Sequence, residues 1–125
     1  MSYDPNRAPE PVTWLSLDEA ERLDGVLRYH QQVRFRADNV RLHAAVHVTV
    51  ENQLAEGHAG ATRALDRLLA EGLDRHEAIH AIGAVATEQI YHALKGRPFD
   101  AAEYDRRLAA LDAVSWRRSG KPPEQ

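Results

Sequence analysis

The chain has 125 residues, of which 28% are charged, and it combines a net charge of -3 with seven histidines and no cysteine. This length can bury one core but is too short for a second catalytic lobe, and the small negative charge argues against a nucleic acid partner, which selects a basic surface. The absence of cysteine excludes disulfides and thiolate chemistry, so imidazole and carboxylate groups would have to hold any bound metal.

Residues 1–13 carry three prolines and few apolar side chains, and we expect them to form a mobile arm. They have neither the basic start nor the apolar core of a signal peptide, and no segment has the apolar length of a membrane span. These features predict a cytoplasmic protein with no membrane contact. The folded domain is expected over residues 14–115, followed by a mobile tail over residues 116–125.

The first helix is predicted over residues 16–36. Ser16 is the expected N-cap, and Glu19 has the spacing of its capping-box partner. Apolar side chains then recur with the 3.6-residue period of a helix, and His30 falls within this apolar stripe. A single histidine in such a position is more often a hydrogen-bonded core residue than a metal ligand.

Four further helices are predicted because capping residues and glycines punctuate the rest of the chain. They are expected over residues 39–57, 61–71 and 74–95 and from residue 100 onward. The stretch VHVTV is rich in β-branched residues, but the residues around it extend a helical period, so we predict a helix there. The predicted fold is an all-α, single-domain helical bundle of about five helices.

A cluster of ionisable side chains is predicted inside this bundle. His43, His47 and Glu51 share one face of the second long helix, among apolar residues, and His76 and His80 lie one turn apart on the fourth predicted helix. A buried carboxylate is costly unless it is compensated, so this face needs either a metal ion or a closed hydrogen-bond network. Packing of the two helices would collect all five groups around a divalent ion such as zinc, iron, manganese or nickel.

Three residues are expected to support this cluster. Gln53 is a candidate hydrogen-bond partner, and His30 is a candidate partner or additional ligand. Glu77 stands three residues after Asp74, which is the spacing of a capping pair, so its simplest role is to close the start of its helix.

The sequence HEAIH, residues 76–80, also matches the HExxH pattern of zinc peptidases. In those enzymes the two histidines bind zinc, the glutamate polarises a water molecule and a third ligand comes from elsewhere in the chain. Two observations argue against this function: the pattern lies in the first turn of its helix, and the chain offers no confident strand along which a peptide substrate would align.

Three segments, RLHAAVHVTVENQLAEG, EGLDRHEAIHAIG and EQIYHALKGRPFDAAEYDRRLAAL, carry a resemblance over roughly residues 13–112. They resemble a bacterial family known only as a domain of unknown function, which has a His-x3-His-x3-Glu-x-Gln helix and a second helix opening with His-Glu or His-Asp before a further histidine. The matching positions are His43, His47, Glu51, Gln53, His76, Glu77 and His80. The family has no assigned activity, so the resemblance implies a shared polar site and no particular substrate.

The sequence therefore predicts a small cytoplasmic metal-binding helical bundle of unknown physiological role, with a buried histidine and glutamate site. One alternative is an HExxH-type zinc-dependent hydrolase. Another is a non-enzymatic dimeric interaction module, in which the same side chains form a structural hydrogen-bond network. Faces such as VENQLAEG offer only a modest apolar area for a core, and we therefore expect a homodimer.

Overall fold

The computed structural model describes residues 2–36 and 38–119, and this part of the chain contains seven helices and no strand. The helices are α1 (Pro11–Ser16), α2 (Glu19–Gln32), α3 (Val40–Ala55), α4 (Ala59–Ala70), α5 (Arg75–Leu94), α6 (Ala101–Ala109) and α7 (Ala113–Arg118). The predicted all-α class is confirmed, although two short helices, α1 and α7, raise the number above about five. No described helix has both the length and the apolar character needed to cross a membrane.

The start of the first long helix differs from the prediction. Pro11 opens the short helix α1, and Ser16 is the last residue of that helix and not a cap. Asp18 is the N-cap of α2 and forms a capping box with Glu21. The predicted pairing of Ser16 with Glu19 is therefore wrong by two residues, because the chain is already helical before Ser16 and Asp18 offers the same capping chemistry.

Local sequence signals predict most ends of the later helices, but α4 begins at Ala59, two residues before the predicted start, because His58 is its N-cap. Asn39, Asp74 and Asp100 cap α3, α5 and α6 with their side chains. Gly57 and Gly72 follow α3 and α4 with φ values of 76° and 100°, a conformation that glycine adopts without strain. The VHVTV stretch lies within α3, so its helical period outweighs its β-branched composition.

The chain continues into a final helix, part of which lies in the tail that the sequence predicts. Asp112 caps α7, and Arg67 of α4 holds the preceding turn by donating to the carbonyls of Leu108 (2.7 Å) and Leu111 (3.0 Å). Residues 116–118 of the predicted tail thus belong to α7. Residues 120–125 lie outside the described residues.

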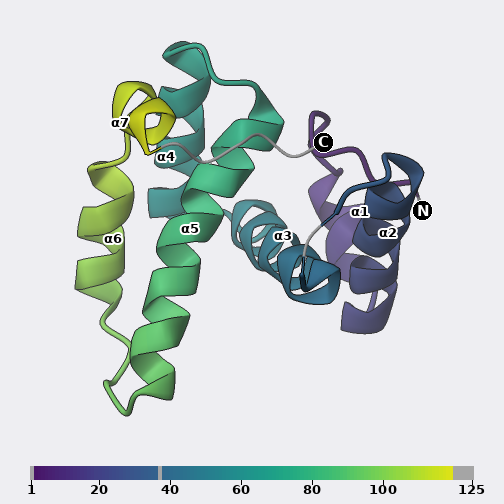
Figure 1. The fold of residues 1–125 in the computed structure, drawn as a ribbon, viewed down its shortest axis with the longest axis horizontal. Helices are drawn as coiled ribbons and strands as arrows, with labels where there is room; N and C mark the ends of the chain where they lie inside the picture. The colour runs from purple at the N-terminus through teal and green to yellow at the C-terminus, as the bar shows by residue number, and fades with distance from the viewer. Residues whose placement is uncertain (1, 37, 120–125) are drawn as a thin grey trace.

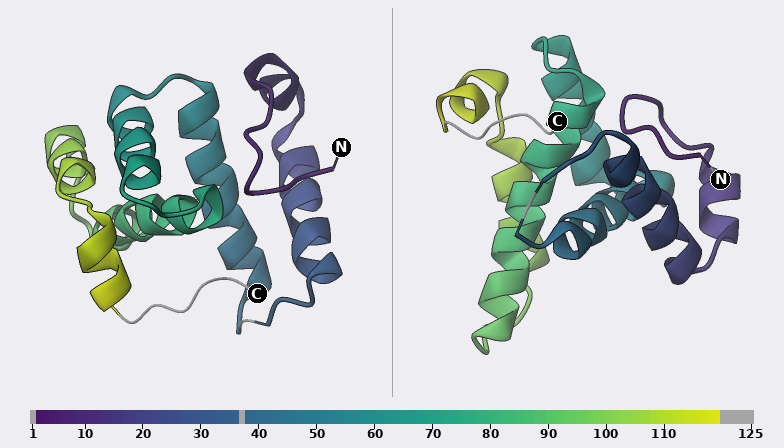
Figure 2. Two further views of the ribbon diagram at one scale, coloured as in Figure 1. Left: turned by 90° about the horizontal axis from the view of Figure 1, so that it is seen from above. Right: turned by 45° about the vertical axis from the view of Figure 1, so that its right-hand side comes forward.

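Helix α3 lies in the middle of the fold (Figure 1). It packs against α1 and α2 on one side and against α4 and α5 on the other, while α6 covers α4 and α5 (Figure 2). One apolar cluster is formed mainly by α4, α5 and α6 and includes Val50 of α3, and a second joins α1 and α2 to Ala44 and Val48 of α3. Because α3 contributes to both clusters, polar side chains on it are held between two packed layers.

The N-terminal segment, residues 2–9, lies against the bundle, whereas the sequence predicts a mobile arm there. The side chains of Tyr3 and Pro5 are buried, and Tyr3 is only 5% exposed. The guanidinium of Arg75 donates a hydrogen bond to the carbonyl of Pro5 at 2.9 Å. The segment therefore covers the start of α5, and it does so through contacts that its proline-rich composition does not reveal.

The crossing of α3 and α5 depends on Gly83. A Cβ atom at this position would lie 2.7 Å from Cγ1 of Val46, which is closer than packed carbon atoms approach. Alanine in a helix interior is normally more stable than glycine by up to about 1 kcal/mol, but overpacking of a core costs about 1–3 kcal/mol.

We therefore expect Gly83→Ala to lower the free energy of unfolding in urea denaturation. Adding Val46→Ala to the same chain should restore part of the loss, because it removes the atom that the new methyl group meets. A loss that Val46→Ala does not relieve would contradict the close crossing as its cause.

Candidate metal centre

Five imidazoles from three helices meet beside the N-terminal segment. His30 comes from α2, His43 and His47 come from α3, and His76 and His80 come from α5. Seven pairs of these rings have centroids between 4.7 and 5.4 Å apart. The structure thus brings the four histidines of the predicted cluster together and adds His30 to them.

The ligand atoms of these histidines form two groups, in each of which all atoms lie within 4.8 Å of one another. The α2 triad consists of His30, His43 and His47, and the α5 triad consists of His47, His76 and His80. His30, His47 and His76 are buried, while His43 and His80 are partly exposed. His47 belongs to both triads and is therefore the central residue of the cluster.

The imidazoles of His47 and His80 approach each other closely, with their Nε2 atoms 3.2 Å apart. Two nitrogens bound to one tetrahedral zinc ion at 2.0–2.1 Å would be separated by about 3.3–3.4 Å. The observed separation is close to this value, so these two nitrogens can bind the same ion after a small side-chain adjustment. The same separation also suits an N–H···N hydrogen bond between the rings.

The end of α2 places His30 and an aromatic ring in the cluster. Arg34 has a φ of 55°, and the N–H of Phe35 bonds back to the carbonyl of His30 at 2.9 Å, which reverses the chain after α2. The Phe35 ring then stacks on His43 with a centroid distance of 4.5 Å. This reversal explains why α2 ends at Gln32 and not at the predicted Arg36.

The proton on His30 can be assigned from its hydrogen bond. Nδ1 of His30 lies 2.8 Å from the carbonyl oxygen of Val26, and a carbonyl oxygen only accepts hydrogen bonds. Nδ1 therefore carries the hydrogen, and in the neutral ring the lone pair is on Nε2. In metal sites, the ring nitrogen that does not bind the ion commonly donates a hydrogen bond to a group such as a backbone carbonyl.

Glu51 lies next to the imidazoles, but it is fully engaged by another residue. Two parallel hydrogen bonds of 2.8 Å join its carboxylate to the guanidinium of Arg75, and the exposed fractions of the two side chains are 1% and 10%. Burial of Arg75 lowers its pKa, but the hydrogen bonds and negative charge of Glu51 outweigh burial and leave the pKa raised. Both oxygens of the Glu51 carboxylate accept from Arg75, which is the paired geometry of a guanidinium–carboxylate ion pair.

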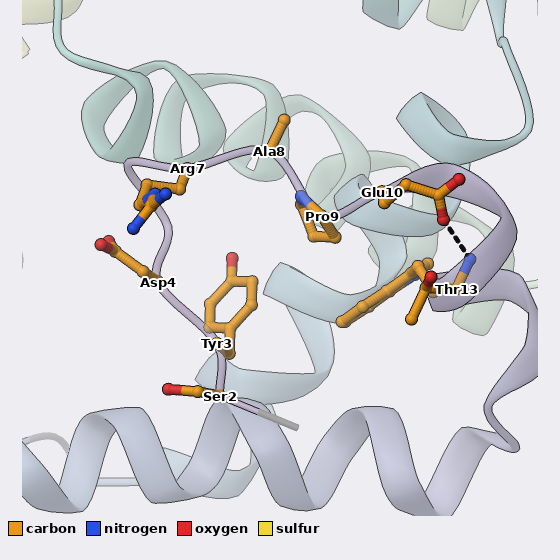
Figure 3. Close-up of a pocket in the computed structure, with 9 residues that line it drawn as sticks. Ser2, Tyr3, Asp4, Arg7, Ala8, Pro9, Glu10 and Thr13 are labelled. Atoms are coloured by element: carbon orange, nitrogen blue, oxygen red, sulfur yellow. Dashed lines mark hydrogen bonds between the residues drawn. The ribbon is translucent and has the colours of Figure 1, made fainter.

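Tyr3 connects this ion pair to the central histidine. Its hydroxyl donates to Oε2 of Glu51 at 2.6 Å and lies 3.2 Å from Nδ1 of His47. The ring is held within the N-terminal segment, which bends around it between Asp4 and Pro9 (Figure 3). Tyr3 thus links Glu51 of the buried ion pair with His47, the residue that the two triads share.

The remaining predicted site residues have other partners. Oε1 of Gln53 accepts a hydrogen bond from the hydroxyl of Tyr104 (2.7 Å), which ties α3 to α6 and not to the imidazoles. The backbone N–H of Glu77 donates to the side chain of Asp74 (2.7 Å), as expected for a residue in a capped first turn. His58 caps α4, with its Nδ1 accepting from the N–H of Ala61.

Two residues of the centre, Arg75 and Tyr3, are absent from the sequence prediction. A buried Glu51 requires a cationic or metal partner, but the sequence does not identify Arg75 as that partner, because the pairing depends on how α3 packs on α5. Tyr3 lies in a proline-containing stretch with no helical period, and its burial depends on tertiary contacts alone.

Comparisons of the chain with models of protein families, with curated proteins and with solved structures found no match. The resemblance to a bacterial domain of unknown function therefore stays a prediction, and the chemistry of the site is argued from its own residues.

Proposed function

We propose that this protein binds one divalent metal ion at the α5 triad, through Nε2 of His47 and the imidazoles of His76 and His80. The observation that supports this most strongly is the convergence of three imidazoles from two helices, including the Nε2 atoms of His47 and His80 at 3.2 Å, in a largely buried position. His30 and His43 flank the ion from the other side of His47.

The donor set indicates which ions suit the site. Its ligands are imidazoles without a carboxylate, because the carboxylate of Glu51 is already bound by Arg75. Imidazole ligands suit zinc, nickel and iron(II), whereas manganese prefers carboxylate and other oxygen ligands. Zinc, nickel or iron is therefore the favoured class of ion.

The position of Tyr3 supports a stoichiometry of one ion per chain. Nδ1 of His47 faces the Tyr3 hydroxyl, so only Nε2 of His47 is directed at a metal position. The α2 and α5 triads both require His47, so an ion in one triad would compete with an ion in the other for this residue.

Elemental analysis of the purified, tag-free protein tests the proposal. We expect close to one equivalent of a transition metal in the wild type and loss of the metal in His47→Ala and His80→Ala, because each change removes a ligand of the α5 triad. His92→Ala is the matched control, since His92 lies in the last turn of the same helix and outside both triads.

His43→Ala separates the two triads in the same experiment. This variant should keep its metal if the ion is held by the α5 triad and lose it if the ion is held by the α2 triad. Equal metal content in the wild type, His47→Ala and His80→Ala would refute the site. The histidines would then form the hydrogen-bond network of a structural module, with an N–H···N bond between His47 and His80.

A zinc-dependent hydrolase is a second candidate, and one observation favours it. The HExxH pattern supplies His76 and His80, and His47 lies where a third ligand is required. In such an enzyme Glu77 would activate a water molecule. Cleavage of a peptide library by the zinc-loaded protein that is lost in Glu77→Gln, with zinc content unchanged, would favour this function over metal binding alone.

A further inference from the structure

We infer that Tyr3 is a positioning residue of the metal centre, which holds the His47 imidazole in the tautomer that leaves its Nε2 atom available to a metal ion. The N-terminal segment would then be part of the centre and not only a cover for the bundle. This inference rests on the proposed metal-binding function, and it assigns that function a residue outside both triads.

The argument starts from the ion pair. The carboxylate of Glu51 is ionised because both of its oxygens accept hydrogen bonds from Arg75, so it can only accept a further hydrogen bond. The hydroxyl hydrogen of Tyr3 therefore points to Oε2 of Glu51, and the two oxygen atoms are 2.6 Å apart. The Tyr3 oxygen can then only accept hydrogen bonds from its other neighbours.

One of these neighbours is Nδ1 of His47, at 3.2 Å from the hydroxyl oxygen. Since the hydroxyl hydrogen is directed at Glu51, Nδ1 must carry a hydrogen in order to donate to Tyr3. A neutral ring with its hydrogen on Nδ1 has its lone pair on Nε2, which is the atom that faces His80. The chain from Arg75 through Glu51 and Tyr3 thus selects the metal-binding tautomer of His47.

The N-terminal segment is fastened at several points, which gives Tyr3 a defined position. Arg75 donates to the carbonyl of Pro5 (2.9 Å), and Oδ1 of Asn6 accepts from the backbone N–H of His76 (3.0 Å). Both contacts are with residues of the first turn of α5, next to the triad. A hydrogen bond that orients a ligand is useful only if its donor or acceptor is itself held in place, and these contacts meet that requirement.

Tyr3→Phe tests this inference because it removes the hydroxyl and keeps the ring. The ring must be kept because it is buried against Trp14 and lines a pocket of about 400 Å³ in the N-terminal segment (Figure 3). The matched control is Tyr104→Phe: the Tyr104 side chain is also buried, and it also loses one hydroxyl hydrogen bond, to Gln53, but it lies outside the centre.

The measurement is calorimetric titration of the metal-stripped full-length protein with Zn²⁺. We expect Tyr3→Phe to weaken Zn²⁺ binding by about 10–100-fold, the usual effect of removing a partner of a metal ligand. Tyr104→Phe should bind Zn²⁺ within about twofold of the wild type, because its lost hydroxyl does not support a ligand. The nitrogen-15 NMR signals of His47 in the metal-free protein give a second readout: Nδ1 should be protonated in the wild type and partly deprotonated in Tyr3→Phe.

The outcomes separate the two proposals. A wild type that binds no Zn²⁺ would refute the proposed function itself. A wild type that binds Zn²⁺ together with an unchanged affinity in Tyr3→Phe would leave metal binding intact and overturn the role of Tyr3. Equal losses of affinity in Tyr3→Phe and Tyr104→Phe would also overturn it, because the effect would then be a general consequence of removing a buried hydroxyl.

Discussion

Replacement of Arg75 by methionine is expected to lower the free energy of unfolding by about 3–5 kcal/mol, the cost of leaving one partner of a buried ion pair without the other. The carboxylate of Glu51 is 1% exposed and relies on two hydrogen bonds from Arg75, so its charge would remain in a dry environment. Methionine preserves much of the aliphatic length of arginine, so the loss should report the missing charge. Urea denaturation of the metal-free protein measures it.

Two variants show whether the buried charge is responsible. In the double variant Glu51→Gln with Arg75→Met, most of the loss should disappear, because glutamine has no charge to compensate and can still accept from Tyr3. Arg28→Met breaks an ion pair with Asp24 in which the two side chains are 57% and 61% exposed. This change should lower the free energy of unfolding by less than about 1 kcal/mol. A double variant that is as unstable as Arg75→Met would contradict this explanation.

Zinc is expected to stabilise the metal-free protein by about 2.7 kcal/mol when its free concentration is 100 times the dissociation constant. The physical reason is that the unfolded chain separates the imidazoles of α3 and α5, so the ion binds the folded state far better. For a domain of this size such a change raises the melting temperature by about 10 °C. Scanning calorimetry at increasing free Zn²⁺ concentrations measures the shift.

The ion and the site provide the controls for this measurement. Magnesium at the same concentration should produce little shift, because it prefers oxygen ligands and retains its hydration water. His47→Ala should abolish the shift caused by zinc, since His47 is common to both triads. An equal shift in the wild type and in His47→Ala would place the bound zinc elsewhere on the protein.

Local signals in the sequence were sufficient to predict most of the helices. Asn39, Asp74 and Asp100 are caps because each side chain accepts a hydrogen bond from an N–H group two or three residues later, which is a local interaction. Gly57 and Gly72 end helices for an equally local reason, the positive φ that follows a helix end. The predicted boundaries were wrong at both ends of α2, where Asp18 caps in place of Ser16 and the chain reverses after Gln32, and at the start of α4, where His58 is the cap.

The cluster could be predicted in part because helical periodicity places side chains on faces. His43 and His47 share a face of α3, and His76 and His80 share a face of α5. Buried polar side chains need partners, which suggested that these two faces would contact each other. The pairing of Glu51 with Arg75 depends on which residues lie opposite each other across the α3–α5 contact. Periodicity within one helix carries no information about that register.

Several predictions from the sequence concern properties that the fold of a single chain does not test. The homodimer, the cytoplasmic location and the identity of the metal remain predictions. The same holds for the relation to the bacterial family of unknown function, which rests on the residues of the two histidine motifs.

The order of the histidines along the chain bears on how the centre is assembled. His30, His43 and His47 all belong to α2 and α3, so a nascent polypeptide presents the whole α2 triad before α5 has been synthesised. His76 and His80 arrive later and complete the second triad around the same His47. Because a domain generally folds as a unit, the α5 triad is complete only after α5 has been made and has packed against α3.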